Sequence, residues 1–149
     1  MIQTPHTYSE WNAVLDMLRD RQDDAAVLAA MQQGTLAWQS GVAERFAKKL
    51  VDTINARMNA ATDKFQKSMS RSGGQEGAIV QALLALRKEL SFLVKAIDLP
   101  VIPEKDRAQY CNLVREQADQ IQTSLEDSAK KDRSGKLSSI VRNHKVNAF

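Results

Sequence analysis

The side chains best suited to chemistry in this sequence are one cysteine and two histidines, and their spacing does not group them. Cys111 could act as a nucleophile beside a histidine, but it falls on an apolar helical position, where a small thiol packs and stays inert. His6 and His144 are 138 positions apart, and zinc needs a cluster of cysteines and histidines. A di-iron site in a helical bundle needs Glu-x-x-His pairs, which this sequence lacks. We therefore predict no catalytic residue, no metal site and no cofactor.

Two glycine-containing segments suggest a phosphate-binding loop, and both fit an ordinary connection better. Ser72-Gly73-Gly74 precedes a predicted helix, whose free N–H groups could hold an anion. Ser134-Gly135-Lys136 looks like the end of a P-loop, but that motif requires Gly at position 130 and Ser or Thr at position 137. Lys130 and Leu137 occupy those positions. We interpret the first segment as a helix connection and the second as a flexible junction.

Two acidic pairs could in principle perform acid–base chemistry. They are Glu116 with Asp119, and Glu126 with Asp127. General acid–base catalysis needs a pocket that shifts carboxyl pKa values, and these pairs lie away from the apolar side of their helix. We interpret them as a solvated helix face. An enzyme with a site assembled from scattered residues remains an alternative hypothesis.

Basic residues form two more informative patterns, the first of them on a predicted long helix. Arg57, Lys64 and Arg71 are seven positions apart with Lys67 beside them, so they share one face. This candidate basic face could contact phosphates, pair with acidic residues of the helix predicted over 104–131, or be solvated.

The second basic pattern is the tail, residues 130–149, which carries a net charge of +5 while the rest of the chain sums to −2. Its apolar residues are spaced as one turn of an amphipathic helix. The candidate docking residues of this tail are Lys136, Leu137, Ile140, Val141, Arg142, Lys145 and Phe149. A segment with both charge and apolar anchors is suited to docking on its own chain, a second subunit, another protein or an acidic polymer.

Apolar periodicity predicts the elements that position these residues. Two short helices are expected within 7–34, the first opened by a capping box of Thr7 and Glu10. Long helices are expected over 35–71, 76–97 and 104–131. The stripe of the 76–97 helix repeats as in a coiled-coil seam. Its residues are Ile79, Leu83, Leu86, Leu90, Leu93 and Ile97. Thr35 is a candidate cap for the 35–71 helix, while Gly41 marks a kink, a close crossing or a later start.

These elements predict an all-α fold: an antiparallel bundle of about five helices, three of them long, with a basic C-terminal tail. Residues 1–129 are expected to form a single bundle domain, and residues 130–149 a basic amphipathic tail. The scarcity of glycine and proline, six and three in 149 residues, agrees with long helices rather than many turns.

Composition suggests where such a chain works and with what. The N-terminal residues lack a basic and apolar leader, apolar stretches are short, and the single cysteine is compatible with a reducing compartment. We therefore expect a cytoplasmic protein with no membrane partner. The leading functional hypothesis is a non-enzymatic interaction protein that binds itself, as a homodimer, or another protein. The alternative is a nucleic-acid-binding protein that uses the basic tail and the basic face.

Overall fold

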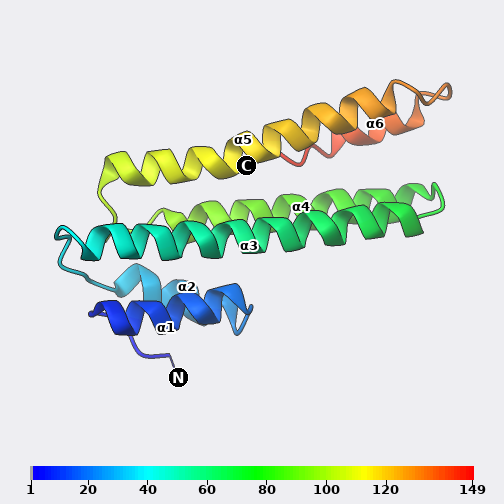
Figure 1. The fold of residues 1–149 in the computed structure, drawn as a ribbon. Coiled ribbons are helices and arrows are strands. Elements are labelled where there is room, and N and C mark those ends of the chain that lie inside the picture. Colours follow the sequence, from blue (N-terminus) through cyan, green and yellow to red (C-terminus); the bar gives the residue numbers. More distant parts are fainter. Residues whose placement is uncertain (1) are drawn as a thin grey trace. The chain divides into compact units, whose positions relative to one another are not determined.

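The computed structural model describes residues 2–149, which form six α-helices and no strand (Figure 1). The helices are α1 (Tyr8–Arg19), α2 (Asp24–Gln33), α3 (Val42–Arg71), α4 (Glu76–Ile97), α5 (Glu104–Ala129) and α6 (Lys136–Asn143). The predicted all-helical fold is confirmed. Within the described residues, no helix combines the length and the apolarity that crossing a lipid bilayer requires.

The helices begin where side chains satisfy the free backbone N–H groups of a first turn. At α1, the Thr7 hydroxyl accepts a hydrogen bond from the Glu10 N–H, and the Glu10 carboxylate accepts one from the Thr7 N–H at 3.1 Å. The predicted capping box is therefore present. At α2, the carboxylate of Asp23 accepts from the Ala26 N–H at 3.3 Å.

The start of α3 differs from the prediction, because the helix begins at Val42 rather than Thr35. Thr35 is bound elsewhere: its N–H donates to the Pro5 carbonyl at 3.0 Å, and its carbonyl accepts from the Trp11 indole at 2.8 Å. Gly41, at a φ of +88°, precedes the helix, and its N–H donates to the Glu44 carboxylate. Of the three predicted roles for Gly41, the later helix start is the one that the structure shows.

The chain folds into two compact units, each discontinuous in sequence. Unit 1 contains residues 2–57 and 93–111, and unit 2 contains residues 58–92 and 112–149. Helices α3, α4 and α5 each contribute residues to both units.

The core of unit 1 is built around aromatic rings. Trp11 is fully buried and meets Phe46 edge to face at a centroid distance of 5.1 Å. Trp38 approaches the same ring at 5.5 Å. Gly34 lies against Trp11 so closely that an added Cβ would overlap the indole. This close packing joins the segment after α2 to α1 and α3.

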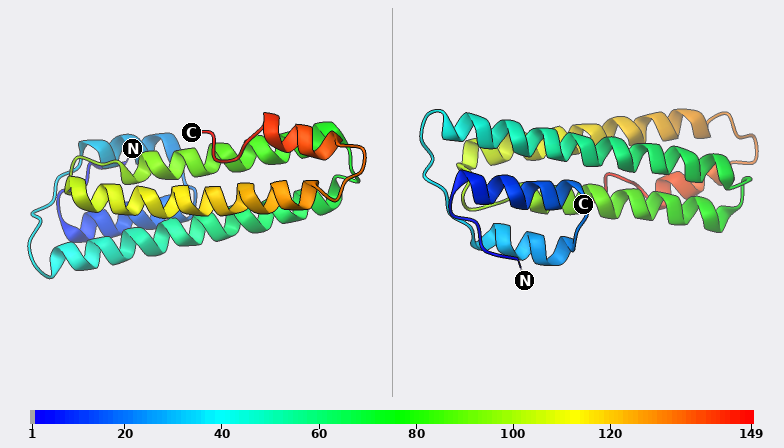
Figure 2. Two further views of the ribbon diagram at one scale, coloured as in Figure 1. Left: turned by 90° about the horizontal axis from the view of Figure 1, so that it is seen from above. Right: turned by 60° about the horizontal axis from the view of Figure 1, so that its bottom comes forward.

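The core of unit 2 is mostly aliphatic, with Phe65 as its buried aromatic residue. All six residues of the stripe predicted on α4 are buried, and the four between Ile79 and Leu90 belong to this unit. Both views of Figure 2 place α6 alongside the first turns of α4. The predicted tail therefore contains an ordered helix, whose residues Ile140 and Val141 are buried.

Candidate functional site

The predicted docking tail supplies the most distinctive feature of unit 2, a C-terminal strap made of residues 136–149. It consists of α6 and an irregular segment that follows it. Val146 in that segment is 0% exposed, and Ile140 and Val141 of α6 are also buried. Burial of these aliphatic side chains stabilises the strap against its own unit. The strap therefore packs on its own chain.

A buried glutamine on α5 fixes the strap through its main chain. Gln122 is 4% exposed, and its side-chain oxygen accepts from the Val146 N–H at 3.1 Å. Its side-chain nitrogen donates to the Val141 carbonyl at 3.4 Å and to the Glu126 carboxylate at 3.0 Å. One amide thus satisfies two backbone groups of the strap that would otherwise be buried without partners. The role of Gln122 is not predictable from the sequence, because a neutral amide beside an apolar stripe gives no signal of its own.

The last residues of the strap are held by side chains of α5. Arg115 donates to the Phe149 carbonyl at 2.9 Å, and its guanidinium lies 5.5 Å from the Phe149 ring centroid, a cation–π contact. Asn147 donates to the Asp119 carboxylate at 2.9 Å. These contacts place Phe149, a predicted docking residue, half-buried against unit 2.

A carboxylate occupies the start of α6. Asp132 accepts hydrogen bonds from the Leu137 N–H at 3.0 Å and from the hydroxyl and N–H of Ser134 at 2.9 and 3.2 Å. The bond from the Leu137 backbone, and then those from Ser134, hold the pKa of Asp132 below its ordinary value. The segment Ser134-Gly135-Lys136 therefore leads into a helix whose first turn donates a hydrogen bond to a carboxylate of its own chain.

The polar side of the strap faces solvent. Lys136, Arg142 and Lys145 are exposed, and none of them forms an ion pair within the described residues. Leu137 is half-buried. The seven predicted docking residues therefore separate into three outward cations and four side chains that pack wholly or partly on unit 2.

The predicted basic face on α3 is not a single surface, and Arg57 is the member that departs from it. Its side chain is 1% exposed and binds both carboxylate oxygens of Asp24, at 2.8 and 2.9 Å, and the Leu18 carbonyl at 2.9 Å. The hydrogen bond from Arg57 is the main cause that lowers the pKa of Asp24. Including Arg57 in an exposed face was wrong, because helical spacing does not reveal a partner 33 positions away. Lys64, Lys67 and Arg71 are exposed, in unit 2.

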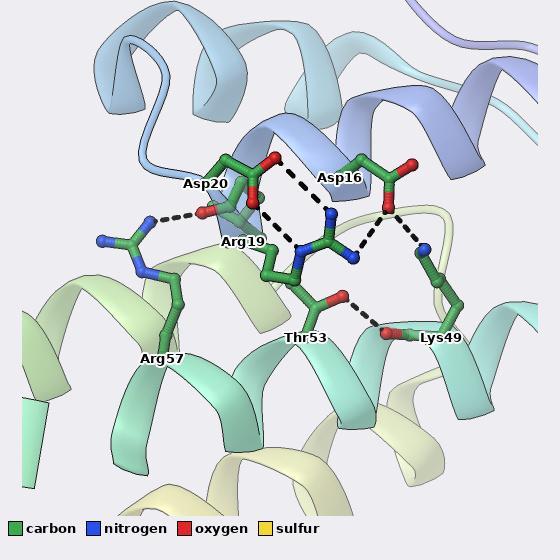
Figure 3. A network of polar contacts seen from close by, with 7 residues as sticks. Asp16, Arg19, Asp20, Lys49, Thr53 and Arg57 are labelled. Carbon is green, nitrogen blue, oxygen red and sulfur yellow. Dashed lines mark hydrogen bonds and ion pairs between the residues drawn. The ribbon is translucent and has the colours of Figure 1, made fainter. Parts of the chain in front are cut away.

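Arg57 belongs to a polar network in unit 1 that links α3 to α1 (Figure 3). Lys49 on α3 lies 2.5 Å from the Asp16 carboxylate of α1, and this bond is the main cause that lowers the pKa of Asp16. Arg19 adds contacts to Asp16 at 3.3 Å and to Asp20 at 3.1 Å. The network holds α1, α2 and α3 together through ion pairs.

The remaining candidate groups have packing roles or lie in open hollows. The Cys111 thiol is half-buried and donates to the Val94 carbonyl at 3.9 Å. Among the described residues, no cluster of three or more His, Cys, Asp or Glu could hold a metal ion. A groove of about 440 Å³ in unit 2 separates the α3–α4 turn from the α5–α6 turn. It is lined by Gly74, Glu76, Ile79, Asp132, Ser134, Lys136, Leu137 and Ile140.

No family model matches this chain, and neither a curated protein nor a solved structure matches it significantly. Its function is therefore inferred from its own residues.

Proposed function

We propose that this chain is a non-enzymatic helical protein that acts by binding another protein, with the C-terminal strap as its docking element. The observation that supports this proposal is the two-sided strap. Its apolar side is fixed to unit 2 through Val146 and Gln122, while the side chains of Lys136, Arg142 and Lys145 are exposed on the opposite side and form no ion pair within the described residues. An ordered helix with outward cations is suited to a partner with an acidic surface.

The experiment neutralises the strap's outer charges and keeps its inner contacts. Removing residues 130–149 would also remove Val146 and uncover Gln122, so a truncation would confound docking with folding. The double variant Arg142→Gln/Lys145→Gln changes only exposed side chains. Its matched control is Arg45→Gln/Lys48→Gln, which removes the same charge from exposed positions of α3 in unit 1.

The wild type, the strap variant and the control variant are each used to capture partners. Any captured protein is identified, purified and titrated against each of the three. We expect the strap variant to bind the purified partner at least tenfold more weakly than the wild type, and the control to bind equally well. Equal binding by the wild type and the strap variant would contradict the role of the strap.

The proposal also includes self-association as a homodimer, an antiparallel arrangement of the three long helices, and a cytoplasmic location. Light scattering at high micromolar concentration tests the first of these. A mass of twice 16.6 kDa is expected, and a mass of 16.6 kDa at every concentration would contradict the dimer.

A further inference from the structure

Positive charge is concentrated in unit 2. Unit 2 contains twelve Lys and Arg side chains and eight Asp and Glu, whereas unit 1 contains nine and ten. Unit 2 therefore carries a net charge of +4 and unit 1 a net charge of −1. This division follows the folded units rather than the tail alone, since the end of α3 contributes to it.

The two units also differ in how their cations are paired. In unit 1, Arg19, Lys49, Arg57 and Arg107 each form an ion pair with a carboxylate. In unit 2, Lys130 forms an ion pair with Asp127 at 3.6 Å. The cations of unit 1 thus stabilise the fold, while most of those in unit 2 remain available to an external anion.

Several of the unpaired cations gather at one end of unit 2. Lys64, Lys67 and Arg71 follow one face of the last turns of α3, a rise of about 10 Å. Lys131 and Arg133 lie in the α5–α6 turn. The α3–α4 turn, which follows Arg71, and the α5–α6 turn line the same groove and are therefore neighbours. Figure 1 shows these two turns at the same end of the unit.

Three of the carboxylates at this end are already engaged or lie at a helix start. Asp127 pairs with Lys130, and Asp132 accepts the hydrogen bonds that cap α6. Glu76 occupies the first turn of α4, where the helix dipole favours a negative charge. The exposed Asp63 precedes Lys64 and lines a shallow hollow together with Lys67 and Arg71. The long Lys and Arg side chains reach beyond these groups into solvent.

The chemistry of this surface favours phosphate over a protein partner. Stable protein interfaces have a buried apolar centre. The one large apolar side chain that is prominently exposed among the described residues is Leu113, at 42%. It lies on α5 about 24 Å along the helix from Ala129, the last residue before the α5–α6 turn. Binding to a nucleic-acid backbone requires only cationic side chains, because each phosphate that they neutralise releases condensed counterions.

We infer that this end of unit 2, with Lys64, Lys67, Arg71, Lys131 and Arg133, binds the phosphate backbone of nucleic acid without reading its sequence. This inference goes beyond the protein-docking role of the strap and uses different residues. The two can therefore fail independently.

The test titrates the protein into a dye-labelled single-stranded RNA of about 20 nucleotides or a dye-labelled DNA duplex of about 20 base pairs. Binding is measured by fluorescence anisotropy at salt concentrations from about 50 to 200 mM. The test variant is Lys67→Gln/Arg71→Gln/Lys131→Gln/Arg133→Gln. The control, Arg45→Gln/Lys48→Gln/Lys95→Gln/Lys105→Gln, removes the same four charges from exposed positions of unit 1. Circular dichroism verifies that both variants retain their helices.

We expect micromolar binding by the wild type at low salt and at least a tenfold loss in the test variant. The slope of log affinity against log salt should fall by about 0.7 to 0.9 for each phosphate contact removed. The unit 1 control should bind within threefold of the wild type. No binding by the wild type, equal losses in the two variants, or competition by polyglutamate as strong as by unlabelled nucleic acid would each overturn the inference.

Discussion

Arg57 shows how a single residue can change the interpretation of a surface. A cation at helical spacing from Lys64 and Arg71 was expected beside them, yet the structure buries it against Asp24 and the Leu18 carbonyl. A guanidinium satisfies such a site because its planar fork binds a carboxylate bidentately and still has donors to spare. Arg57 therefore joins three elements: the end of α1, the start of α2 and the middle of α3.

Replacing Arg57 with methionine should destabilise the protein by about 2 kcal/mol, because charge-assisted bonds to Asp24 and a carbonyl bond are lost. Lys64→Met, on the exposed part of the same helix, should change the free energy of unfolding by less than about 0.5 kcal/mol. Urea denaturation of both variants measures the difference. Equal midpoints would show that the Arg57 contacts contribute nothing.

The ion-paired carboxylates of Asp16 and Asp24 should make the stability of unit 1 sensitive to acid. Their pKa values in the folded chain lie below the ordinary 3.8, Asp16 through the bond from Lys49 and Asp24 through that from Arg57. Their contribution to stability is therefore complete above the unfolded-state pKa and is lost as the pH falls through the lower folded-state values. We expect the free energy of unfolding to decline below about pH 4, and to decline less in Asp16→Asn/Asp24→Asn. Unchanged pH dependence in that variant would contradict this assignment.

At the scale of elements, the strap depends on one side chain of α5. Gln122→Ala leaves the buried Val146 N–H without its acceptor, which should destabilise the strap by about 2 kcal/mol. Hydrogen exchange at the Val146 amide should accelerate correspondingly. Gln120→Ala, two positions away on the exposed side of α5, is the control. Equal protection of the Val146 amide in both variants would contradict the role of Gln122.

Replacement by alanine should have opposite effects on stability at two glycines, Gly34 and Gly77. At Gly34, a Cβ would overlap Trp11 and crowd Pro5 at 3.0 Å, so Gly34→Ala should destabilise the chain by about 2 kcal/mol. At Gly77, in the first turn of α4, a Cβ meets nothing within 4 Å. Gly77→Ala should stabilise the chain by about 0.5 to 1 kcal/mol, because alanine is the better helix former. Thermal denaturation of the pair distinguishes the two effects, and destabilisation by both would contradict the open space at Gly77.

Most helices could be predicted from the sequence, because their signals are local. The capping box at Thr7 and the stripe of α4 depend on residues within a few turns of one another. The predicted start of α3 at Thr35 was wrong, because Thr35 forms hydrogen bonds with Pro5 and Trp11, which belong to a distant segment of the chain. The burial of Arg57 and the role of Gln122 escaped prediction for the same reason: their partners are far away in the chain.

At the scale of the whole molecule, the chain alternates between its two units. It crosses from one to the other after Arg57, after Phe92 and after Cys111, so neither unit is a continuous stretch of sequence. A simple deletion therefore removes part of a unit rather than all of it. Point substitutions in the full chain are therefore the appropriate perturbations of either unit.

The aromatic composition of the two units determines what optical methods can observe. Both tryptophans, Trp11 and Trp38, and both tyrosines, Tyr8 and Tyr110, belong to unit 1, whereas the aromatic residues of unit 2 are phenylalanines. Intrinsic emission therefore reports on the surroundings of Phe46 and is blind to the strap. A tryptophan introduced at Phe149 would supply a chromophore beside Arg115 and make movement of the strap visible in the spectrum.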